Sequence, residues 1–176
     1  MKLIKLTVAL AMVGFGFLSF MNETTEPPVG LKIGDRAPEI NTNLLSGVDF
    51  SSAEFKGQMI LIDFWASYDA NSRIGNHMKE VLLDKYKDRS FLKGDGFTIV
   101  SISLDRFRNP LIKAIENDQM NYPYHICDFN GRQSDLVKTF KAQDLKKVLV
   151  DGDGRIVAVS SNMEVISSSL QRLSVN

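Results

Sequence analysis

Two apolar segments in the first half of the chain predict buried β-strands. Residues 59–65, "MILIDFW", are apolar at every position except Asp63, as is typical of a strand buried on both faces. Residues 97–104, "FTIVSISL", are rich in β-branched side chains, which favour strands. We therefore expect two neighbouring strands in the centre of a sheet.

A helix is predicted between these strands, over about residues 70–89. Apolar residues recur there at helical spacing, and the expected buried face consists of Ile74, Met78, Val81, Leu82 and Tyr86. The segment "SFLKGDG", residues 90–96, ends the helix with two glycines. Strand, helix and strand in this order form a βαβ unit, in which the two strands are parallel.

Shorter elements follow in the second half. Residues 111–118, "LIKAIEND", predict a short amphipathic helix. Residues 122–127, "YPYHIC", predict a short strand, and Pro123 favours the edge of the sheet. Residues 134–141, "SDLVKTFK", predict a helix with Ser134 as its N-cap.

The strongest local pattern is "KVLVDGDGRIVAVS", residues 147–160. Two apolar strands flank Asp151-Gly152-Asp153-Gly154, whose glycines accept positive φ angles, so an antiparallel hairpin is expected. The turn resembles part of a calcium loop but lacks the later acidic ligands. With a closing helix over residues 164–173, the pattern predicts an α/β fold with a central mixed sheet flanked by helices.

The N-terminal segment differs from the rest of the chain. Lys2 and Lys5 precede an uncharged apolar run over residues 6–20, which is typical of a signal peptide. We predict a signal peptide or an uncleaved anchor over residues 1–21, a linker over residues 22–34 and one domain over residues 35–176. The chain is then exported to the periplasm or cell envelope, with membrane contact only through an uncleaved N-terminal segment.

Composition excludes several classes of protein. Lysine plus arginine equals aspartate plus glutamate at 21 each, so the chain has no net field to attract nucleic acid. Cys127 is the only cysteine, which excludes a disulfide framework. Asp63, Asp69 and His77 show no spacing that requires them to converge, so neither a metal site nor a cofactor is expected.

Four segments, in their order and spacing, resemble one family. They are "GLKIGDRAPEI", "SSAEFKGQMILIDFWAS", "VSISLD" and "LVDGDGRIVA". Over about residues 30–173 the chain resembles the TlpA/ResA-like branch of the thioredoxin superfamily, which are exported bacterial thiol-disulfide oxidoreductases related to the AhpC/TSA peroxiredoxins. The resemblance implies a thioredoxin-like fold, and a face beside the active site that receives a partner protein.

The chain departs from this family at the residues that carry its chemistry. The family has Trp-Cys-x-x-Cys after the active-site strand, whereas this chain has Tyr68, then Asp69-Ala70-Asn71-Ser72. Asp69 stands at the position of the nucleophilic cysteine and Ser72 at that of the resolving cysteine. The family also has a cis-proline before the hairpin, and Leu145 occupies about that position.

These replacements exclude disulfide exchange at this site. Exchange requires a thiolate that attacks sulfur and a second thiol that releases the mixed disulfide. Neither a carboxylate nor a hydroxyl can cycle between dithiol and disulfide. We interpret Asp69 as a helix N-cap, because a carboxylate there accepts backbone N–H groups and is favoured by the helix dipole.

Three functional hypotheses follow. The first is a redox-inactive binding or scaffold module that uses the family's docking face, with Trp65, Tyr68, Asp69 and Leu145 as candidate binding residues. Tyr122 and Tyr124 could add to an aromatic groove there. The partner would be a protein or peptide.

The alternatives are enzymes. In the second hypothesis Cys127, which shares a strand face with His125, acts as the activated thiol of an oxidoreductase or peroxidase; the competing interpretation is a buried cysteine that packs as a small hydrophobic residue. The third is hydrolytic or metal-dependent chemistry around Asp69. The role of Asp63, an acid inside a buried strand, is left open because a buried acid needs a partner or a proton.

Overall fold

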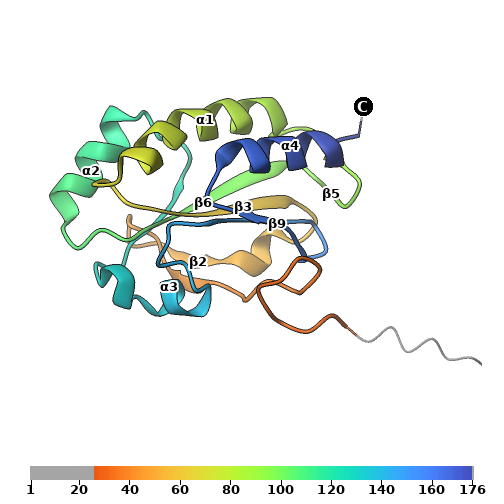
Figure 1. The fold of residues 1–176 in the computed structure, drawn as a ribbon, viewed down its shortest axis with the longest axis horizontal. Coiled ribbons are helices and arrows are strands. Elements are labelled where there is room, and N and C mark those ends of the chain that lie inside the picture. Colours follow the sequence, from red (N-terminus) through yellow and green to blue (C-terminus); the bar gives the residue numbers. More distant parts are fainter. Residues whose placement is uncertain (1–25, 176) are drawn as a thin grey trace, which may run out of the picture.

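A five-stranded sheet forms the centre of the molecule (Figure 1), whose computed structural model describes residues 26–175. The strand order is β7-β6-β3-β8-β9. The central strand β3 pairs in parallel with β6 and antiparallel with β8; β7 is parallel to β6, and β9 is antiparallel to β8. The strands are β3 (Met59–Trp65), β6 (Phe97–Ser103), β7 (Tyr124–Ile126), β8 (Lys147–Val150) and β9 (Ile156–Ser160). The predicted mixed α/β sheet is confirmed, with β7 at an edge.

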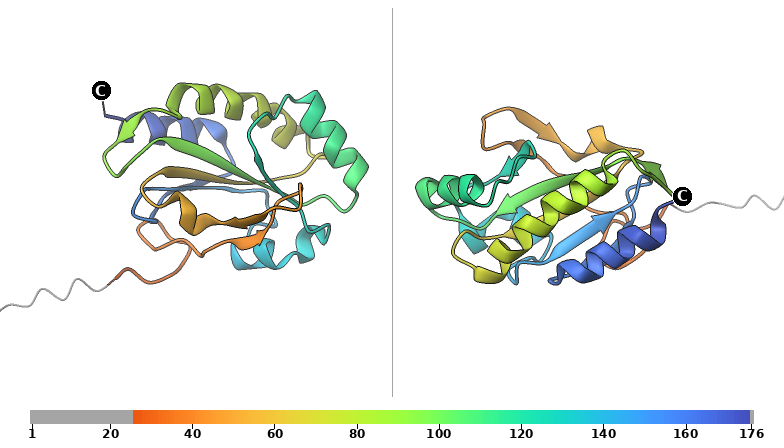
Figure 2. Two further views of the ribbon diagram at one scale, coloured as in Figure 1. Left: turned by 180° about the vertical axis from the view of Figure 1, so that it is seen from behind. Right: turned by 90° about the horizontal axis from the view of Figure 1, so that it is seen from above.

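Helices and a small hairpin cover the two faces of this sheet. Helices α1 (Ala70–Tyr86) and α4 (Met163–Leu173) lie side by side on one face (Figure 2), above the sheet in Figure 1. The other face carries α3 (Asp135–Thr139), the hairpin of β1 (Asn41–Asn43) and β2 (Asp49–Ser51), and the 3-10 turn η1 (Ser52–Phe55). Helix α2 (Arg108–Asn117) leads from β6 towards the edge strand β7.

The sheet therefore has an apolar core on each face. One is built on Ile60, Ile62 and Phe64 of β3 and includes Phe140. The other is built on Leu61 and Trp65 of the same strand. Alternate side chains of β3 point to opposite cores, so the whole strand is buried. A strand with one face in water would instead alternate apolar with polar residues.

The buried face of α1 is not the face that its apolar residues predict. Ile74 is 75% exposed and Val81 52% exposed, so the predicted orientation of these residues is wrong. The helix buries Leu82 and Tyr86 as expected, but its first half buries small and polar residues, namely Ser72, Gly75, Asn76 and Lys79. These residues lie at i, i+3, i+4 and i+7, so they also form one helical face. Polar groups beneath α1 account for this choice, as described below.

Two further expectations need correction. Residues 90–96 do not merely end the helix, because β4 (Ser90–Phe91) and β5 (Gly94–Asp95) pair as a short antiparallel hairpin. Ser134 stands at the N-cap of α3 as predicted, but its side chain makes no capping hydrogen bond.

The DGDG segment is confirmed as a hairpin turn, in which Asp151 Oδ1 accepts backbone N–H groups from Asp153 and Arg155 at 3.0 and 2.8 Å.

The chain before β1 runs along the end of the β8–β9 hairpin. Gly34 N donates to Ile156 O at 2.8 Å, and Ala37 N donates to Gly154 O at 2.9 Å. The signal peptide or anchor predicted for residues 1–21 lies outside the described residues. Over residues 26–175 none of the helices combines the length and the apolar character needed to cross a membrane.

Candidate functional site

The candidate site lies where β3 ends and α1 begins. Because β3 and β6 are parallel, the loops that follow them meet at the same end of the sheet. Ser67, in the first loop, donates its backbone N–H to Asp105 Oδ2 at 2.9 Å and its hydroxyl to Oδ1. Ser103 donates its hydroxyl to the same carboxylate at 2.6 Å. Asp105 therefore ties the loop before α1 to the loop after β6.

Asp69 caps α1. It is the N-cap residue, and its Oδ1 accepts the backbone N–H of Ser72 at 2.7 Å. This confirms the capping role predicted from the sequence. Asp69 is half-buried and Ser72 is buried. The start of α1 therefore presents a carboxylate already engaged by the helix, with a hydroxyl beneath the surface.

Leu145 lies at the same end of the sheet. In the register of the β3–β8 pair, Asp63 is opposite Lys147, and Phe64 N donates to Lys146 O at 3.0 Å. Residue 145 is therefore beyond the end of the pair, on the side where β3 ends. Leu145 has a φ of 58°, and residues 26–175 contain no cis peptide bond. The half-buried Leu145 side chain packs against the core, so little of it is free to contact a partner.

The expected aromatic groove is not formed. Trp65 is 1% exposed and Tyr122 is buried with it in the core beneath α1. Tyr124 is on the other face of the sheet, where its ring lies 4.9 Å from that of Phe55. Of the four aromatic residues only Tyr68, at 65%, is exposed. Trp65 is thus a core residue, and Tyr68 is the aromatic side chain that a partner can reach.

A hollow of about 320 Å³ opens beside Tyr68. Its lining residues come from the loop after β3, from the loop after β6 and from a segment that includes the 3-10 turn η2 (Gly131–Gln133). They are Tyr68, Leu104, Arg106, Asn130, Gly131, Arg132 and Gln133. The sequence analysis did not identify Arg106 and Arg132. Arg106 could have been found, because it follows a strand parallel to β3, but nothing local to Arg132 indicates that its loop folds back to this end.

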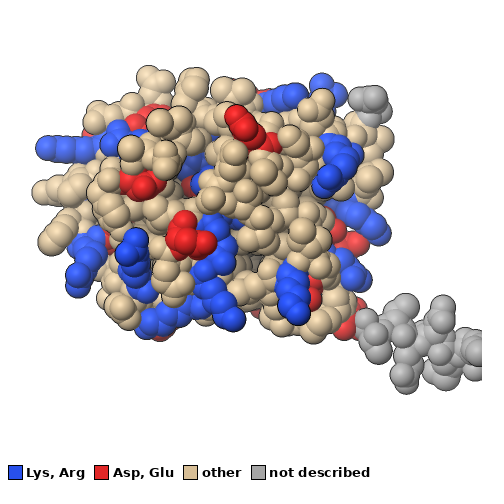
Figure 3. All heavy atoms as spheres, viewed as in Figure 1, with Lys and Arg blue, Asp and Glu red and all other residues tan. Residues whose placement is uncertain are grey.

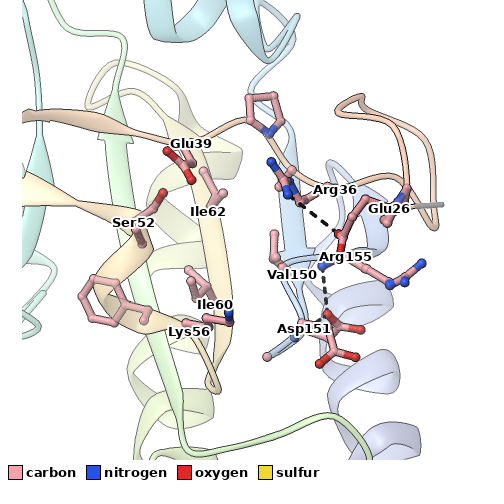
Figure 4. Close-up of a pocket in the computed structure, with 18 residues that line it drawn as sticks. Glu26, Arg36, Glu39, Ser52, Lys56, Ile60, Ile62, Val150, Asp151 and Arg155 are labelled. Carbon is pink, nitrogen blue, oxygen red and sulfur yellow. Dashed lines mark hydrogen bonds and ion pairs between the residues drawn. The ribbon is translucent and has the colours of Figure 1, made fainter. Parts of the chain in front are cut away.

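A second, larger hollow of about 460 Å³ lies at the opposite end of β3 (Figure 4). Ile60 and Ile62 of β3 lie on one side of it, and Val150 and Arg36 on the other. Its lining carries both signs of charge, with the cations Arg36, Lys56 and Arg155 and the acids Glu26, Glu39, Asp151 and Asp153. Arg36 is paired with Glu26 at 3.8 Å. This hollow is remote from the start of α1 and shows no preference for one sign of charge.

Cys127 and His125 do not form an activated pair. Cys127 follows β7, is partly buried, and its Sγ donates to the backbone oxygen of Asp105 at 3.4 Å. Burial raises the pKa of the Cys127 thiol above its ordinary value, and Asp105 and Asp128 raise it further. His125 Nε2 lies 3.3 Å from Met120 O, and burial lowers the His125 pKa. At neutral pH these shifts favour a protonated thiol and a neutral imidazole, so His125 supplies no positive charge to activate Cys127.

Asp63 forms a buried ion cluster with two lysines. Lys79 Nζ of α1 contacts one carboxylate oxygen, and Lys147 Nζ of β8 is 3.4 Å from the other. Burial alone would raise the pKa of Asp63, but the two lysine charges together hold it below its ordinary value. Burial lowers the pKa of Lys79, against the opposing effect of Asp63. This cluster lies beneath the polar half of α1 and explains why that half faces inward.

Asp63 and His77, the two residues that could join Asp69 in metal chemistry, lie in different surroundings. Asp63 is committed to Lys79 and Lys147, whereas His77 is exposed on α1. Among residues 26–175, no group of three or more His, Cys, Asp and Glu side chains is placed to hold a metal ion. The geometry thus gives no support to metal chemistry around Asp69.

Comparison with known proteins places this arrangement in a family. Residues 57–156, more than half of the chain, match the family model described as "Thioredoxin-like". The chain is 27% identical over 156 residues to the thioredoxin-like protein YneN of Bacillus subtilis, covering 80% of this chain and 92% of that protein.

Solved structures agree with this match. The thioredoxin domain of a thiol-disulfide oxidoreductase from Bacteroides vulgatus superimposes with a TM-score of 0.69 at 26% identity, over 81% of this chain and 98% of that one. A thiol-disulfide oxidoreductase from Bacteroides fragilis superimposes with a TM-score of 0.67 at 28% identity, over 78% of this chain and 98% of that one. Because the family model matches more than half of the chain, the chain belongs to the thioredoxin-like family, and its structural neighbours include thiol-disulfide oxidoreductases.

Proposed function

We propose that this chain is a redox-inactive thioredoxin-like protein that binds an extended protein segment at the start of α1. The observation that carries the proposal is the chemistry of that helix start. A carboxylate caps the helix and a buried hydroxyl follows at the third helical position, in a chain whose single cysteine, Cys127, lies after β7 and not on α1. Oxygen at both positions leaves no route for electrons between this site and a disulfide.

The capping carboxylate also explains how the fold is kept without the dithiol. A thiolate at a helix N-terminus is stabilised by free backbone N–H groups and by the helix dipole. Asp69 supplies a negative charge in the same place and accepts the Ser72 N–H, an interaction that typically contributes about 1 kcal/mol. The loop ahead of it is held by Asp105 through Ser67. The helix start is thus stabilised without a thiolate.

Binding is supported by what this end of the sheet exposes. Tyr68 presents most of its ring to solvent directly before the cap, and the hollow beside it is lined mainly by polar side chains. Tyrosine and arginine are the side chains that most often dominate the energetics of protein interfaces. They are placed here by loops fixed to the ends of rigid strands, an arrangement that reduces the entropy lost on binding.

The proposal places the protein in the cell envelope. This location is inferred from residues 1–21, whose positively charged start and apolar run are typical of exported proteins. Catalysis through Cys127 is disfavoured, because the thiol donates to the Asp105 carbonyl and burial raises the pKa of the thiol.

Binding can be tested with a polypeptide that has no disulfide to exchange. The probe is fluorescent insulin B chain, reduced and S-alkylated, with fluorescence anisotropy as the measurement. Saturable binding by the native sequence and its loss in Tyr68→Ala are expected. Val48→Ala serves as the matched control, because Val48 is equally exposed but lies in the loop between β1 and β2. Equal binding by Tyr68→Ala and the native protein would refute the proposed surface.

A further inference from the structure

We infer that the hollow beside Tyr68 selects protein segments that carry acidic side chains, with Arg106 and Arg132 as the residues that recognise them. This inference rests on the proposed binding function and adds the chemical class of its partner. The relevant surface, called here the arginine hollow, consists of Tyr68, Arg106, Asn130, Gly131, Arg132 and Gln133, with Leu104 beneath.

The lining of the arginine hollow has one sign of charge. It contains two guanidinium groups and no carboxylate. Within residues 26–175 neither Arg106 nor Arg132 takes part in an ion pair. The larger hollow at the other end of β3 differs, because it mixes cations with acids and its Arg36 is already paired with Glu26. Two unpaired guanidinium groups in one hollow favour an anionic occupant.

The nearby carboxylates are engaged by other groups. Asp69 accepts the Ser72 N–H, and Asp105 is buried and bound by Ser67 and Ser103. Asp128 Oδ1 accepts the Asn130 N–H at 3.0 Å. These acids reduce the local positive potential, but none of them forms an ion pair with either arginine of the hollow. A carboxylate supplied by a partner would therefore be the first to pair with these two arginines.

The backbone of η2 supports the side chain of Arg106. Gly131 has a φ of 57°, and a Cβ built there would lie 3.1 Å from Arg106 Cγ. The aliphatic stem of Arg106 thus packs against the bare backbone of η2, the turn that also carries Arg132. A guanidinium with a supported stem loses less conformational entropy when it binds, and its planar donors match both oxygens of a carboxylate.

The surroundings favour a protein segment over a free anion or a nucleic acid. Phe107, next to Arg106 in the chain, is 73% exposed, and Tyr68 adds a second exposed ring. Exposed aromatic side chains offer an apolar contact that a small anion cannot use. Lysine and arginine side chains gather over α3 in the lower left of Figure 3, but the whole chain has no net charge. A local basic surface with aromatic neighbours suits an acidic peptide that also carries an apolar side chain.

The test compares two peptides on the full chain. One is a flexible peptide of Gly and Ser with one Leu between Glu residues, and the other has Gln in place of each Glu. Affinity is measured by fluorescence anisotropy at low and at high salt. The Glu peptide is expected to bind about fivefold or more tightly than the Gln peptide, with the difference reduced by salt.

Variants locate the effect. Arg106→Gln and Arg132→Gln are each expected to lower the affinity for the Glu peptide by up to about fivefold. Neither should change the affinity for the Gln peptide. Lys56→Gln, which removes an exposed cation at the other hollow, is the matched control and should change neither affinity. All three side chains are exposed, so thermal unfolding should confirm that each variant folds.

The outcomes separate the two proposals. If both peptides bind equally and Tyr68→Ala weakens both, the surface binds peptides but the acidic preference is wrong. If neither peptide binds, or if Tyr68→Ala has no effect, the proposed binding function fails as well. A single-stranded oligonucleotide that binds more tightly than the Glu peptide, with the same dependence on Arg106 and Arg132, would overturn the choice of a protein partner.

Discussion

At the scale of single residues, Asp63, Lys79 and Lys147 place two positive charges and one negative charge in the core. Lys79 Nζ also lies 5.3 Å from the centre of the Trp65 ring, which offers a further favourable contact. The carboxylate is the partner on which both ammonium groups depend, whereas Asp63 keeps one partner if either lysine is lost. The three residues should therefore respond very differently to substitution.

Removing the acid is expected to be far more costly than removing Lys79. Asp63→Asn leaves two buried cations without a counter-charge, and should lower the free energy of unfolding by about 3–5 kcal/mol. Lys79→Met keeps the Asp63–Lys147 pair and removes the excess positive charge, so its cost should be about 1 kcal/mol or less. Urea unfolding of the two variants measures the difference. Equal losses would contradict the geometry of the cluster.

The same cluster predicts a dependence of stability on pH. The pKa of Lys79 is lower in the folded protein than the ordinary 10.5, so between the folded value and 10.5 the unfolded chain binds more protons. The free energy of unfolding should therefore rise with pH from the folded pKa of Lys79 up to about 10.5, and Lys79→Met should lack this rise. Asp63 acts in the same direction at lower pH, because its depressed pKa gives stability that is lost as the pH falls below 3.8 and acid protonates it. Urea unfolding midpoints of the native protein and of Lys79→Met, measured from acidic to alkaline pH, test both effects.

The sequence indicated that Asp63 needed a partner but could not identify it. An acid inside an otherwise apolar strand must be paired or protonated. Lys79 is 16 residues away on a helix, and Lys147 is on a strand whose register only the folded sheet defines. Neither lysine is marked by its own surroundings in sequence, so the cluster emerges from packing alone.

At the scale of elements, α1 shows how a buried polar group can override an apolar pattern. Ile74, Met78 and Val81 would form an acceptable buried stripe, yet they are exposed because Lys79 and Asn76 must face inward. Gly75 lies on the same buried face, where a Cβ would be 3.4 Å from Met163 of α4. The strands were easier to predict, since continuous apolar runs such as residues 59–65 have no polar alternative face.

Two substitutions in α1 distinguish the observed face from the predicted one. Leu82→Ala should lower the free energy of unfolding by about 2–5 kcal/mol, because it leaves a cavity in the core. Ile74→Gln should change it by about 0.5 kcal/mol or less, because the side chain is already in water. Chemical denaturation measures both. A large loss for Ile74→Gln would mean that this face is covered in solution.

At the scale of the whole molecule, the sheet order brings together what the chemistry of the site requires. The order β7-β6-β3-β8-β9 brings the loops after β3 and β6 to the start of α1, and the segment before β8 reaches the same end. The order of the family segments was enough to predict this fold. The arginine hollow was not predictable, because η2 reaches Tyr68 through a loop whose path no local pattern encodes.

The central claim is that Asp69 and Ser72 leave the start of α1 without the two sulfur atoms that disulfide exchange requires. Reduction of insulin disulfides by dithiothreitol, followed by turbidity, tests it directly when the Cys127→Ser protein is compared with Asp69→Cys/Ser72→Cys in the same background. The account predicts background turnover for the first protein and turnover above background for the second, because the paired cysteines would occupy an accessible cap and a buried position beneath it. Catalytic turnover by the Cys127→Ser protein, which has no sulfur at that site and no cysteine elsewhere, would contradict the account.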